Sequence, residues 1–359
     1  MRLLAGPDRA RWGGRAGRPA RCAAGVAVTV TSLILVAGCQ FPGTGSSAGS
    51  GPTASGTITV VAPAGVADAP LYIGIRDGLF SRAGLTVKVV PASSAQPAMS
   101  AKQEVAALGS GSADIVFADY ADMFYAQELK PSPHLLAVAD GYDAGPGVME
   151  ILTLPGSNIV SPKDLVGKTI GTGQAQLMPL TGRGGHPRPY SQDTLAAWSV
   201  LQSDNVDQTA IHWDPMPTAN LIDALKSHQV DAILATEPAI YEAESQLGAV
   251  PVLDACTGAT ANLPLYGYFT NKAYADRNGR AVTAFRAALE KAQAQASMAA
   301  PLQTALTKSA GLKPQTAALV TFGSYPTTVS APNIQRVVNL LFFFNALGGT
   351  LNVPSLVFK

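Results

Sequence analysis

Short β-branched runs alternate with amphipathic segments along most of this chain, which is the pattern of an α/β protein. The clearest example covers residues 58–90. Residues 58–62 form an apolar run, residues 70–80 carry apolar positions at helical spacing, and residues 85–90 alternate between apolar and polar positions. This order predicts a βαβ unit, in which a helix joins two parallel strands by a right-handed crossover.

The turn after the first predicted strand, residues 65–69, is a candidate binding site because ligands bind at the carboxyl edge of open α/β sheets. It lacks the Gly-x-Gly-x-x-Gly pattern that cradles phosphates, so we do not expect a nucleotide there. Asp68 could bind a ligand amine or could cap the following helix, and the sequence favours neither. Ala69 belongs to the same turn. Tyr72 could stack on a ligand, although an aromatic residue at helical spacing more often lies in the core.

Two segments of the chain, residues 107–116 and 224–233, share one pattern. Each has Ala-Leu at the end of a predicted helix, then a polar turn, an aspartate and an apolar strand. Such recurrence indicates two α/β lobes of similar construction, although helix–turn–strand junctions occur in any α/β protein. The first strand leads to Asp119 and Tyr120 and the second to Glu237, and the carboxyl-edge rule makes Asp119 and Tyr120 candidate ligand contacts.

The predicted second lobe has a loop that corresponds to residues 65–69 in the first. It follows a strand that begins at residues 168–171, and it contains Thr172 and Gln174. Because facing loops form a cleft, we expect Thr172 and Gln174 to contact the ligand from the second lobe. Tyr266 begins an aromatic run near the end of that lobe and is a further candidate contact.

An unusual polar segment, residues 182–190, contains Arg183, His186 and Arg188. The two arginines could grip a sulfonate or carboxylate ahead of the next predicted helix, whose N-terminus also favours anions. A solvated surface loop is the simpler explanation, and both interpretations stay open.

The N-terminal segment has the layout of a secretory signal. Six of the 25 Lys and Arg residues and one of the 24 acids lie in residues 1–38, and residues 22–38 are uncharged. The sequence Leu-Val-Ala-Gly-Cys that ends at Cys39 resembles the lipobox of bacterial lipoproteins, in which this cysteine becomes the first residue and receives a lipid. An ordinary signal with a chance cysteine is the alternative. Gly, Ser and Pro dominate residues 41–52, which favours a flexible tether.

The rest of the chain has the composition of a protein with a large core. Of the 359 residues, 47% are apolar and 14% are charged, which argues against disorder. With the N-terminal charges removed, the net charge is −4 and no basic stripe remains, so a nucleic-acid partner is not expected. Cys256 is the only cysteine after Cys39, so we expect no internal disulfide and a small buried side chain rather than a nucleophile.

Short motifs follow one another in order between about residue 57 and residue 287. Together they resemble the ABC-importer substrate-binding proteins of the nitrate/sulfonate/taurine and thiamine-pyrimidine-precursor group. Each motif alone is weak, but their order and the lipobox make the set specific. The resemblance rests on residues 69–73, 77–80, 83–85, 111–115, 161–168, 230–233 and 237–238.

This resemblance implies a two-lobed periplasmic-binding-protein fold of type II, with a mixed sheet flanked by helices in each lobe and a ligand cleft between the lobes. It implies that Glu237 faces the cleft, which makes Glu237 the strongest single candidate, and that a membrane permease receives the ligand. We expect the following division: a signal peptide at 1–38, a tether at 39–56, lobe 1 at 57–150, lobe 2 at 151–266, and helices that return to lobe 1 at 267–359. Among these helices we predict a long Ala-rich one over residues 281–299.

The predicted function is that of an extracytoplasmic, lipid-anchored and monomeric substrate-binding protein for nutrient uptake, without catalytic residues, cofactor or metal. The histidines are scattered, and no His-Glu-x-x-His, Cys-x-x-Cys or Gly-x-Ser-x-Gly pattern is present. A thiamine-pyrimidine-synthase-like enzyme and a surface adhesin or envelope chaperone are the alternatives.

The sequence leaves two ligand classes open. Acids at Asp68, Asp119 and Glu237 with nearby tyrosines favour an amine-bearing or heteroaromatic nutrient that resembles a thiamine precursor. Arg183 and Arg188 favour a sulfonate- or taurine-like anion, and their segment departs from the simpler loop expected in the family.

Overall fold

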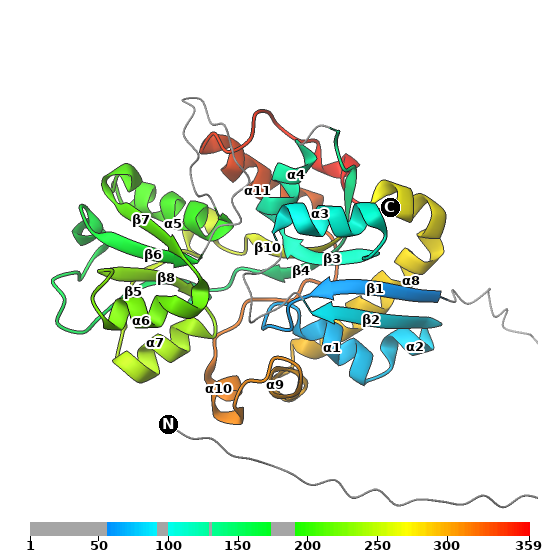
Figure 1. The fold of residues 1–359 in the computed structure, drawn as a ribbon, viewed down its shortest axis with the longest axis horizontal. Coiled ribbons are helices and arrows are strands. Elements are labelled where there is room, and N and C mark those ends of the chain that lie inside the picture. The colour runs from blue at the N-terminus through cyan, green and yellow to red at the C-terminus, as the bar shows by residue number, and fades with distance from the viewer. Residues whose placement is uncertain (1–55, 92–99, 129–130, 174–190) are drawn as a thin grey trace, which may run out of the picture. The chain divides into compact units, whose positions relative to one another are not determined.

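Two mixed five-stranded sheets form the framework of the protein (Figure 1). The computed structural model describes residues 56–91, 100–128, 131–173 and 191–359. All of them belong to one unit, Ser50–Lys359, and no helix in these ranges is long and apolar enough to cross a membrane. The predicted signal peptide, Cys39, Gln174 and the segment with Arg183 and Arg188 lie outside the described residues.

The first sheet contains β1 (Gly56–Ala62), β2 (Leu85–Pro91), β3 (Ile115–Asp119), β4 (Leu135–Asp143) and β10 (Pro264–Asn271). Its strand order is β2-β1-β3-β10-β4. Strand β1 pairs in parallel with β2 and β3, whereas β10 runs antiparallel to β3 and β4. The strand that returns late in the sequence therefore lies between two early ones.

The second sheet contains β5 (Met149–Thr153), β6 (Thr169–Gly173), β7 (His212–Met216), β8 (Ala232–Thr236) and β9 (Val250–Asp254). Its order is β7-β6-β8-β5-β9, and β5 runs antiparallel to β8 and β9. Both sheets thus have the same construction, three parallel strands followed by one antiparallel and one further strand. This confirms the predicted α/β class with a mixed sheet in each half.

The βαβ unit predicted at residues 58–90 is present, but its helix is broken. Helix α1 (Ala69–Arg76) ends at Asp77, and α2 (Leu79–Arg82) begins after Gly78. Gly78 has a φ angle of +66°, a left-handed conformation that glycine adopts without a steric penalty. A single helix over residues 70–80 was therefore the wrong prediction, because Gly78 turns the chain before Leu79.

The recurring aspartates confirm the duplication. Asp114 accepts a hydrogen bond from the amide of Thr59 at 2.7 Å, and its own amide donates to the Thr59 carbonyl at 2.9 Å. Asp231 makes the same two bonds with Thr169, both at 2.8 Å. Asp114 therefore aligns β3 with its parallel neighbour β1, and Asp231 aligns β8 with its parallel neighbour β6.

The remaining helices lie around the two sheets, and α9 and α10 pack on other helices rather than on strands (Figure 1). They are α3 (Ala101–Ser110), α4 (Tyr120–Gln127), α5 (Gln192–Ser203), α6 (Leu221–Lys226), α7 (Ala239–Leu247), α8 (Lys272–Ala296), α9 (Ala299–Lys308), α10 (Pro314–Leu319) and α11 (Ala331–Phe343). Short 3-10 helices are η1 (Pro162–Leu165), η2 (Gln208–Ala210), η3 (Thr218–Asn220), η4 (Gly258–Thr260) and η5 (Val353–Ser355). Helix α8 packs on α1, α2, β4 and β10, and so lies against the first sheet.

Helix α8 starts earlier than its sequence pattern suggested. The side chain of Asn271 accepts a hydrogen bond from the Tyr274 amide at 2.7 Å and caps the helix, which therefore begins at Lys272 rather than near residue 281. Asn278 departs from helical geometry with φ −123°. The first turns of α8 therefore form a separate short segment before the predicted Ala-rich part, which begins at residue 281.

The chain passes between the two sheets over residues 144–148 and 255–263. Cys256 lies in the second of these segments and is 2% exposed, which confirms the prediction of a small buried side chain. The larger hydrophobic cluster includes side chains from both sheets, such as Ile58 and Ile151. The division into lobes at residues 150 and 266 stays a prediction.

Candidate ligand-binding site

A cavity of about 360 Å³ lies where residues at the carboxyl ends of strands from both sheets meet. The first sheet contributes the turn after β1, the end of β3 and the start of the antiparallel β10. The second contributes the last residue of β6, the start of α5 and the residue after β8. This is the edge of an α/β sheet at which ligands bind.

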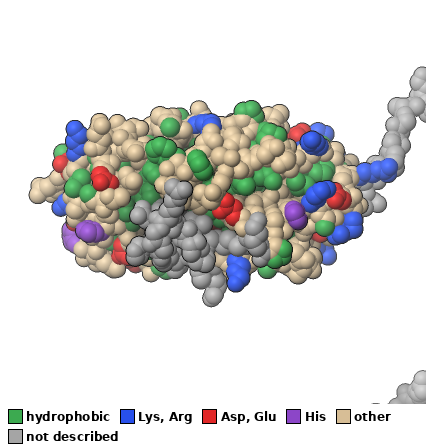
Figure 2. Space-filling view, turned by 90° about the horizontal axis from the view of Figure 1, so that it is seen from above, with side chains coloured by type: hydrophobic (Ala, Val, Ile, Leu, Met, Phe, Trp, Pro, Cys, Tyr) green, Lys and Arg blue, Asp and Glu red, His purple; other side chains and the backbone are tan. Residues whose placement is uncertain are grey.

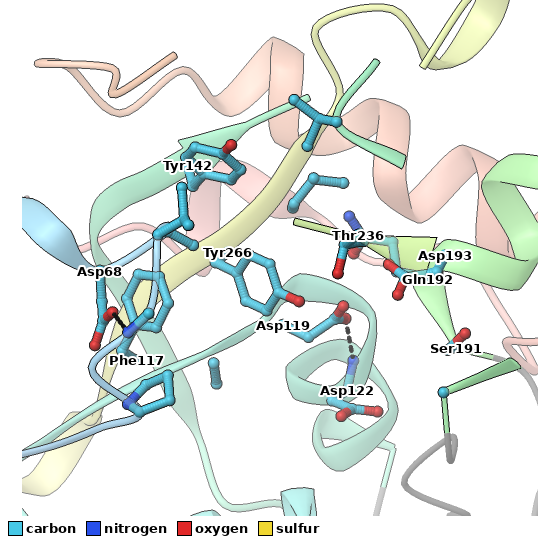
Figure 3. A pocket seen from close by; sticks show the side chains of 18 of the residues that line it. Asp68, Phe117, Asp119, Asp122, Tyr142, Ser191, Gln192, Asp193, Thr236 and Tyr266 are labelled. Carbon is cyan, nitrogen blue, oxygen red and sulfur yellow. Dashed lines mark hydrogen bonds between the residues drawn. The ribbon is translucent and has the colours of Figure 1, made fainter. Parts of the chain in front are cut away.

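Four of the residues singled out in the sequence line this cavity: Asp68, Asp119, Glu237 and Tyr266. They come from segments far apart in the chain, and the fold brings them together (Figure 3). Gln174, Arg183 and Arg188 lie outside the described residues, between Gly173 and Ser191, which both line the cavity.

The other four candidates do not line the cavity. Ala69 is buried at the start of α1, and Thr172 is buried within β6. Tyr72 is half-buried against the hydrophobic core. Tyr120 is fully buried, and its hydroxyl donates a hydrogen bond to the Asp140 carboxylate.

Asp68 closes its own turn. Its carboxylate accepts hydrogen bonds from the amides of Ala64 at 2.8 Å and Gly65 at 2.5 Å (Figure 3). It makes no capping bond to α1, so the side chain stabilises the turn before the helix rather than the helix end. Burial raises the pKa of Asp68 to about 6, and the two amide bonds act against this shift.

An acidic end of the cavity is formed by four carboxyl groups, those of Glu104, Asp119, Asp122 and Asp193. Asp119 accepts hydrogen bonds from the amides of Ala121 at 2.7 Å and Asp122 at 3.2 Å and thereby caps α4. Figure 3 shows the side chains of Asp119, Asp122 and Asp193 on one side of Tyr266, with Asp68 on the other.

The acids at this end disfavour one another's charge. Burial, together with the charge of Asp119, raises the pKa of Glu104 to about 8. Burial and the charges of Glu104 and Asp193 raise the pKa of Asp122 to about 8 as well. Burial raises the pKa of Asp193 to about 6 and that of Asp119 well above its usual range. These shifts have the signature of a site that lacks countercharge from the residues that the structure describes.

Of these four acids, only Asp119 was a sequence candidate. Asp122 lies one helical turn after Asp119, and Asp193 lies in the first turn of the helix that follows the second-lobe loop, so spacing could have indicated both. Glu104 gives no such signal, because it lies within α3 and only the packing of α3 brings it to the cavity.

An aromatic pair forms another part of the wall. The rings of Phe117 and Tyr266 stack with their centroids 5.4 Å apart and their planes at 15°. Both side chains line the cavity, and Tyr142 lies nearby (Figure 3). The pair offers a flat apolar surface next to the acidic end.

Two polar side chains link parts of the two sheets around the cavity. The Glu237 carboxylate accepts hydrogen bonds from the amides of Thr321 at 2.9 Å and Tyr241 at 3.1 Å. The Gln192 side chain donates to the Pro264 carbonyl at 2.6 Å and accepts from the Ala121 amide at 3.1 Å. Glu237 thus lines the cavity with both oxygens engaged by backbone amides.

The described lining residues include six Asp or Glu side chains and no Lys, Arg or His. On the face seen in Figure 2, charged side chains of both signs are scattered among neutral ones. No group of three His, Cys, Asp or Glu side chains among the described residues is arranged to hold a metal ion.

The model of the family described as NMT1/THI5 like matches residues 67–305, which include strands of both sheets and most of the cavity. The chain belongs to the NMT1/THI5-like family. Membership confirms the group indicated by the sequence motifs and supports a substrate-binding role. No curated protein matches this member of the family.

Solved structures with the same fold include binding proteins and an enzyme. The periplasmic aliphatic sulphonate binding protein SsuA from Escherichia coli is 18% identical with a TM-score of 0.64, and the match covers 84% of this chain and 97% of SsuA. The periplasmic nitrate-binding protein NrtA from Synechocystis PCC 6803 is 14% identical with a TM-score of 0.60, over 84% of each chain.

The desulfurization enzyme DSZB is 15% identical with a TM-score of 0.63, over 84% of this chain and 96% of the enzyme. At such identities the likeness shows the fold alone. It confirms the two-lobed periplasmic-binding-protein fold predicted for this family member.

Proposed function

We propose that this protein is a lipid-anchored, extracytoplasmic substrate-binding protein that captures a small organic nutrient by closure of two lobes and delivers it to the permease of an ABC importer. The observation that carries this proposal is the cavity, because residues from both sheets line it. A ligand in that position contacts both halves at once, so its binding energy favours the closed arrangement.

The polar contacts around the cavity support closure as the mode of capture. Glu237 follows a strand of the second sheet and holds the amide of Thr321, and the nearby Ser324 pairs with Asp143 at the end of β4. Gln192 at the start of α5 holds β10 of the first sheet. Opening the lobes along the 144–148 and 255–263 segments would break these bonds. Closure around a ligand would form them again and add the contacts of the ligand with both lobes.

The N-terminal sequence supports an extracytoplasmic location and a lipid anchor. Residues 1–38 have the layout of a signal peptide, Cys39 is the proposed lipidation site, and residues 41–52 provide a tether between the membrane and the folded unit. A tethered binding protein stays close to its permease.

For the ligand we propose an amine-bearing or heteroaromatic nutrient, because six carboxyl groups and a stacked aromatic pair line the cavity. A sulfonate- or taurine-like anion is the second candidate, and the observation that favours it is the sulfonate-binding SsuA fold together with Arg183 and Arg188 in the sequence. An anion would have to overcome repulsion from the acidic end.

A thermal-shift screen of the purified mature protein tests the proposal. We expect one compound among thiamine precursors, organic amines, taurine, alkanesulfonates and nitrate to raise the melting temperature, because a ligand that binds only the folded state stabilises it by mass action. The ligand should be recovered unchanged. Conversion of the compound would indicate an enzyme, and no shift with any compound would contradict a small-molecule binder.

A further inference from the structure

Glu104 lies buried in the wall of the cavity without a side-chain partner in the part of the chain that the structure describes. It lies on α3, is 8% exposed and lines the cavity. Its carboxyl group makes no hydrogen bond or ion pair with any residue that the structure describes. A buried carboxylate without a donor or countercharge is costly, so a site that retains one has a reason to keep it.

The neighbouring acids repeat this arrangement. Asp122 on α4 and Asp193 on α5 line the same cavity, and their carboxyl groups have no partner within the described residues either. Three separate helices therefore direct an acid to one end of the cavity. Among these acids, the described residues provide hydrogen-bond donors only to Asp119, namely the two amides at the start of α4.

We propose that the acidic end of the cavity binds the ammonium group of an organic cation. This inference rests on the proposed function and gives the chemical class of its ligand. The cation supplies the countercharge and the N–H donors that Glu104, Asp122 and Asp193 lack. The carbon skeleton of the ligand lies against the Phe117–Tyr266 pair, whose rings also attract a cation that passes over their faces.

Two features favour an organic cation over a metal ion. No group of three acids, histidines or cysteines among the described residues is arranged for metal coordination. The cavity of about 360 Å³ has an apolar wall, which a bare ion would leave unfilled.

Protonation of the acids explains how the free protein can keep several carboxyl groups close together at this end of the cavity. The pKa values of Glu104 and Asp122 rise to about 8, so near neutral pH these groups carry protons when the cavity is empty. A cation that binds displaces those protons and compensates the negative charges in their place. Asp119 and Asp193 are the other titrating groups at this end of the cavity.

The test compares probes of different charge at pH 8 by thermal shift and titration calorimetry. The cations are methylammonium, choline, benzylamine and putrescine, each measured against sodium chloride of equal ionic strength. Benzyl alcohol is the neutral probe, and benzenesulfonate, methanesulfonate and nitrate are the anionic probes. We expect at least one organic cation to raise the melting temperature and the neutral and anionic probes to leave it unchanged.

Variants locate the binding group. Glu104→Gln and Asp193→Asn should each weaken the best cation about tenfold or more, because each removes a charged hydrogen-bond partner. Asp204→Asn at the exposed end of α5 is the matched control and should leave the affinity unchanged. Both cavity variants replace an acid that has no hydrogen-bond partner among the described residues, so the free proteins should fold, as circular dichroism would verify.

The outcomes separate this inference from the proposed function. If an anion raises the melting temperature and no cation does, the ligand class is wrong while the binding function stands. The inference also fails if no cation gives a shift beyond that of sodium chloride, or if the cavity variants bind cations as well as wild type. If no probe or nutrient of any charge gives a shift, both proposals fail.

Discussion

At the scale of single residues, the aspartates before β3 and β8 do the same work in the two sheets. Each aspartate bonds to the backbone of the neighbouring parallel strand. Each also accepts a hydrogen bond from a threonine of the neighbouring antiparallel strand. The Thr270 hydroxyl donates to the Asp114 carbonyl at 2.7 Å, and the Thr153 hydroxyl donates to the Asp231 carbonyl at 2.9 Å. Each aspartate therefore connects three strands at the same point of its sheet.

Asp114→Ala and Asp231→Ala should each lower the free energy of unfolding by roughly 1–3 kcal/mol, because each leaves a strand amide without its acceptor. Urea denaturation measures this loss. Asp223→Ala, at an exposed position of α6, is the control and should change stability little. Losses no larger than that of the control would show that the paired aspartates do not fix the strands.

A second prediction at this scale concerns pH. The folded state raises the pKa of Glu104 from 4.5 to about 8 and that of Asp122 from 3.8 to about 8, so it binds these protons more tightly than the unfolded chain. Stability therefore falls as pH rises from about 4 to about 8 and then levels off.

Melting temperatures of the free protein between pH 5 and pH 8 measure this loss. Glu104→Gln does not titrate, so its melting temperature should fall less steeply over the same range. A wild-type melting temperature that rises with pH over this range, or an equal slope in the variant, would contradict the burial of an unpaired carboxyl group at this position.

At the scale of elements, helix α11 fastens the second segment that passes between the sheets. The guanidinium of Arg336 donates hydrogen bonds to the carbonyls of Ala259 at 2.8 Å, Ala261 at 2.7 Å and Asn262 at 3.2 Å. One side chain thus satisfies three carbonyls of residues 255–263. Opening of the lobes would have to occur around this fixed point.

Arg336→Ala should loosen the segment, because it leaves these carbonyls without their donor. Hydrogen–deuterium exchange of the amides in residues 255–263 should accelerate, while exchange in β1 and β2 stays as in wild type. Arg277→Ala in α8 is the control, because among the described residues Arg277 makes no hydrogen bond to this segment, whereas Arg336 makes three. Unchanged exchange in residues 255–263 would show that Arg336 is not what holds them.

The sequence predicted the elements better than their ends. The alternation of strand and helix and the recurring aspartates were sufficient for the βαβ unit and for two similar sheets, because they reflect local burial and backbone pairing. The break at Gly78 and the early start of α8 at Asn271 depend on backbone geometry and a side-chain cap that hydrophobic spacing does not encode.

The site was predictable only in part for the same reason. Asp68 and Asp119 follow strands, so the carboxyl-edge rule led to them, whereas the family resemblance led to Glu237. Glu104 lies on α3, and the sequence of this helix does not indicate that one of its faces lines a cavity. Only the tertiary packing of α3 brings it to the cavity, beside acids that follow β3 and begin α5.

At the scale of the whole molecule, two similarly built sheets contribute to a cavity, and the polar contacts around it would favour a closed arrangement. Glu237 and Gln192 provide these contacts in the free protein. The acidic end and the aromatic pair leave room for one small ligand with a charged and an apolar part.

Native mass spectrometry can show directly whether the cavity holds one small molecule per chain. The mature protein is incubated with a mixture of small nutrients, and its mass is compared with that of Ala67→Trp, which fills the cavity, and of Ala83→Trp, whose side chain lies outside it. The account predicts one intact small molecule per chain in wild type and in Ala83→Trp, and none in Ala67→Trp. Absence of any bound molecule in wild type, or equal binding by Ala67→Trp, would contradict it.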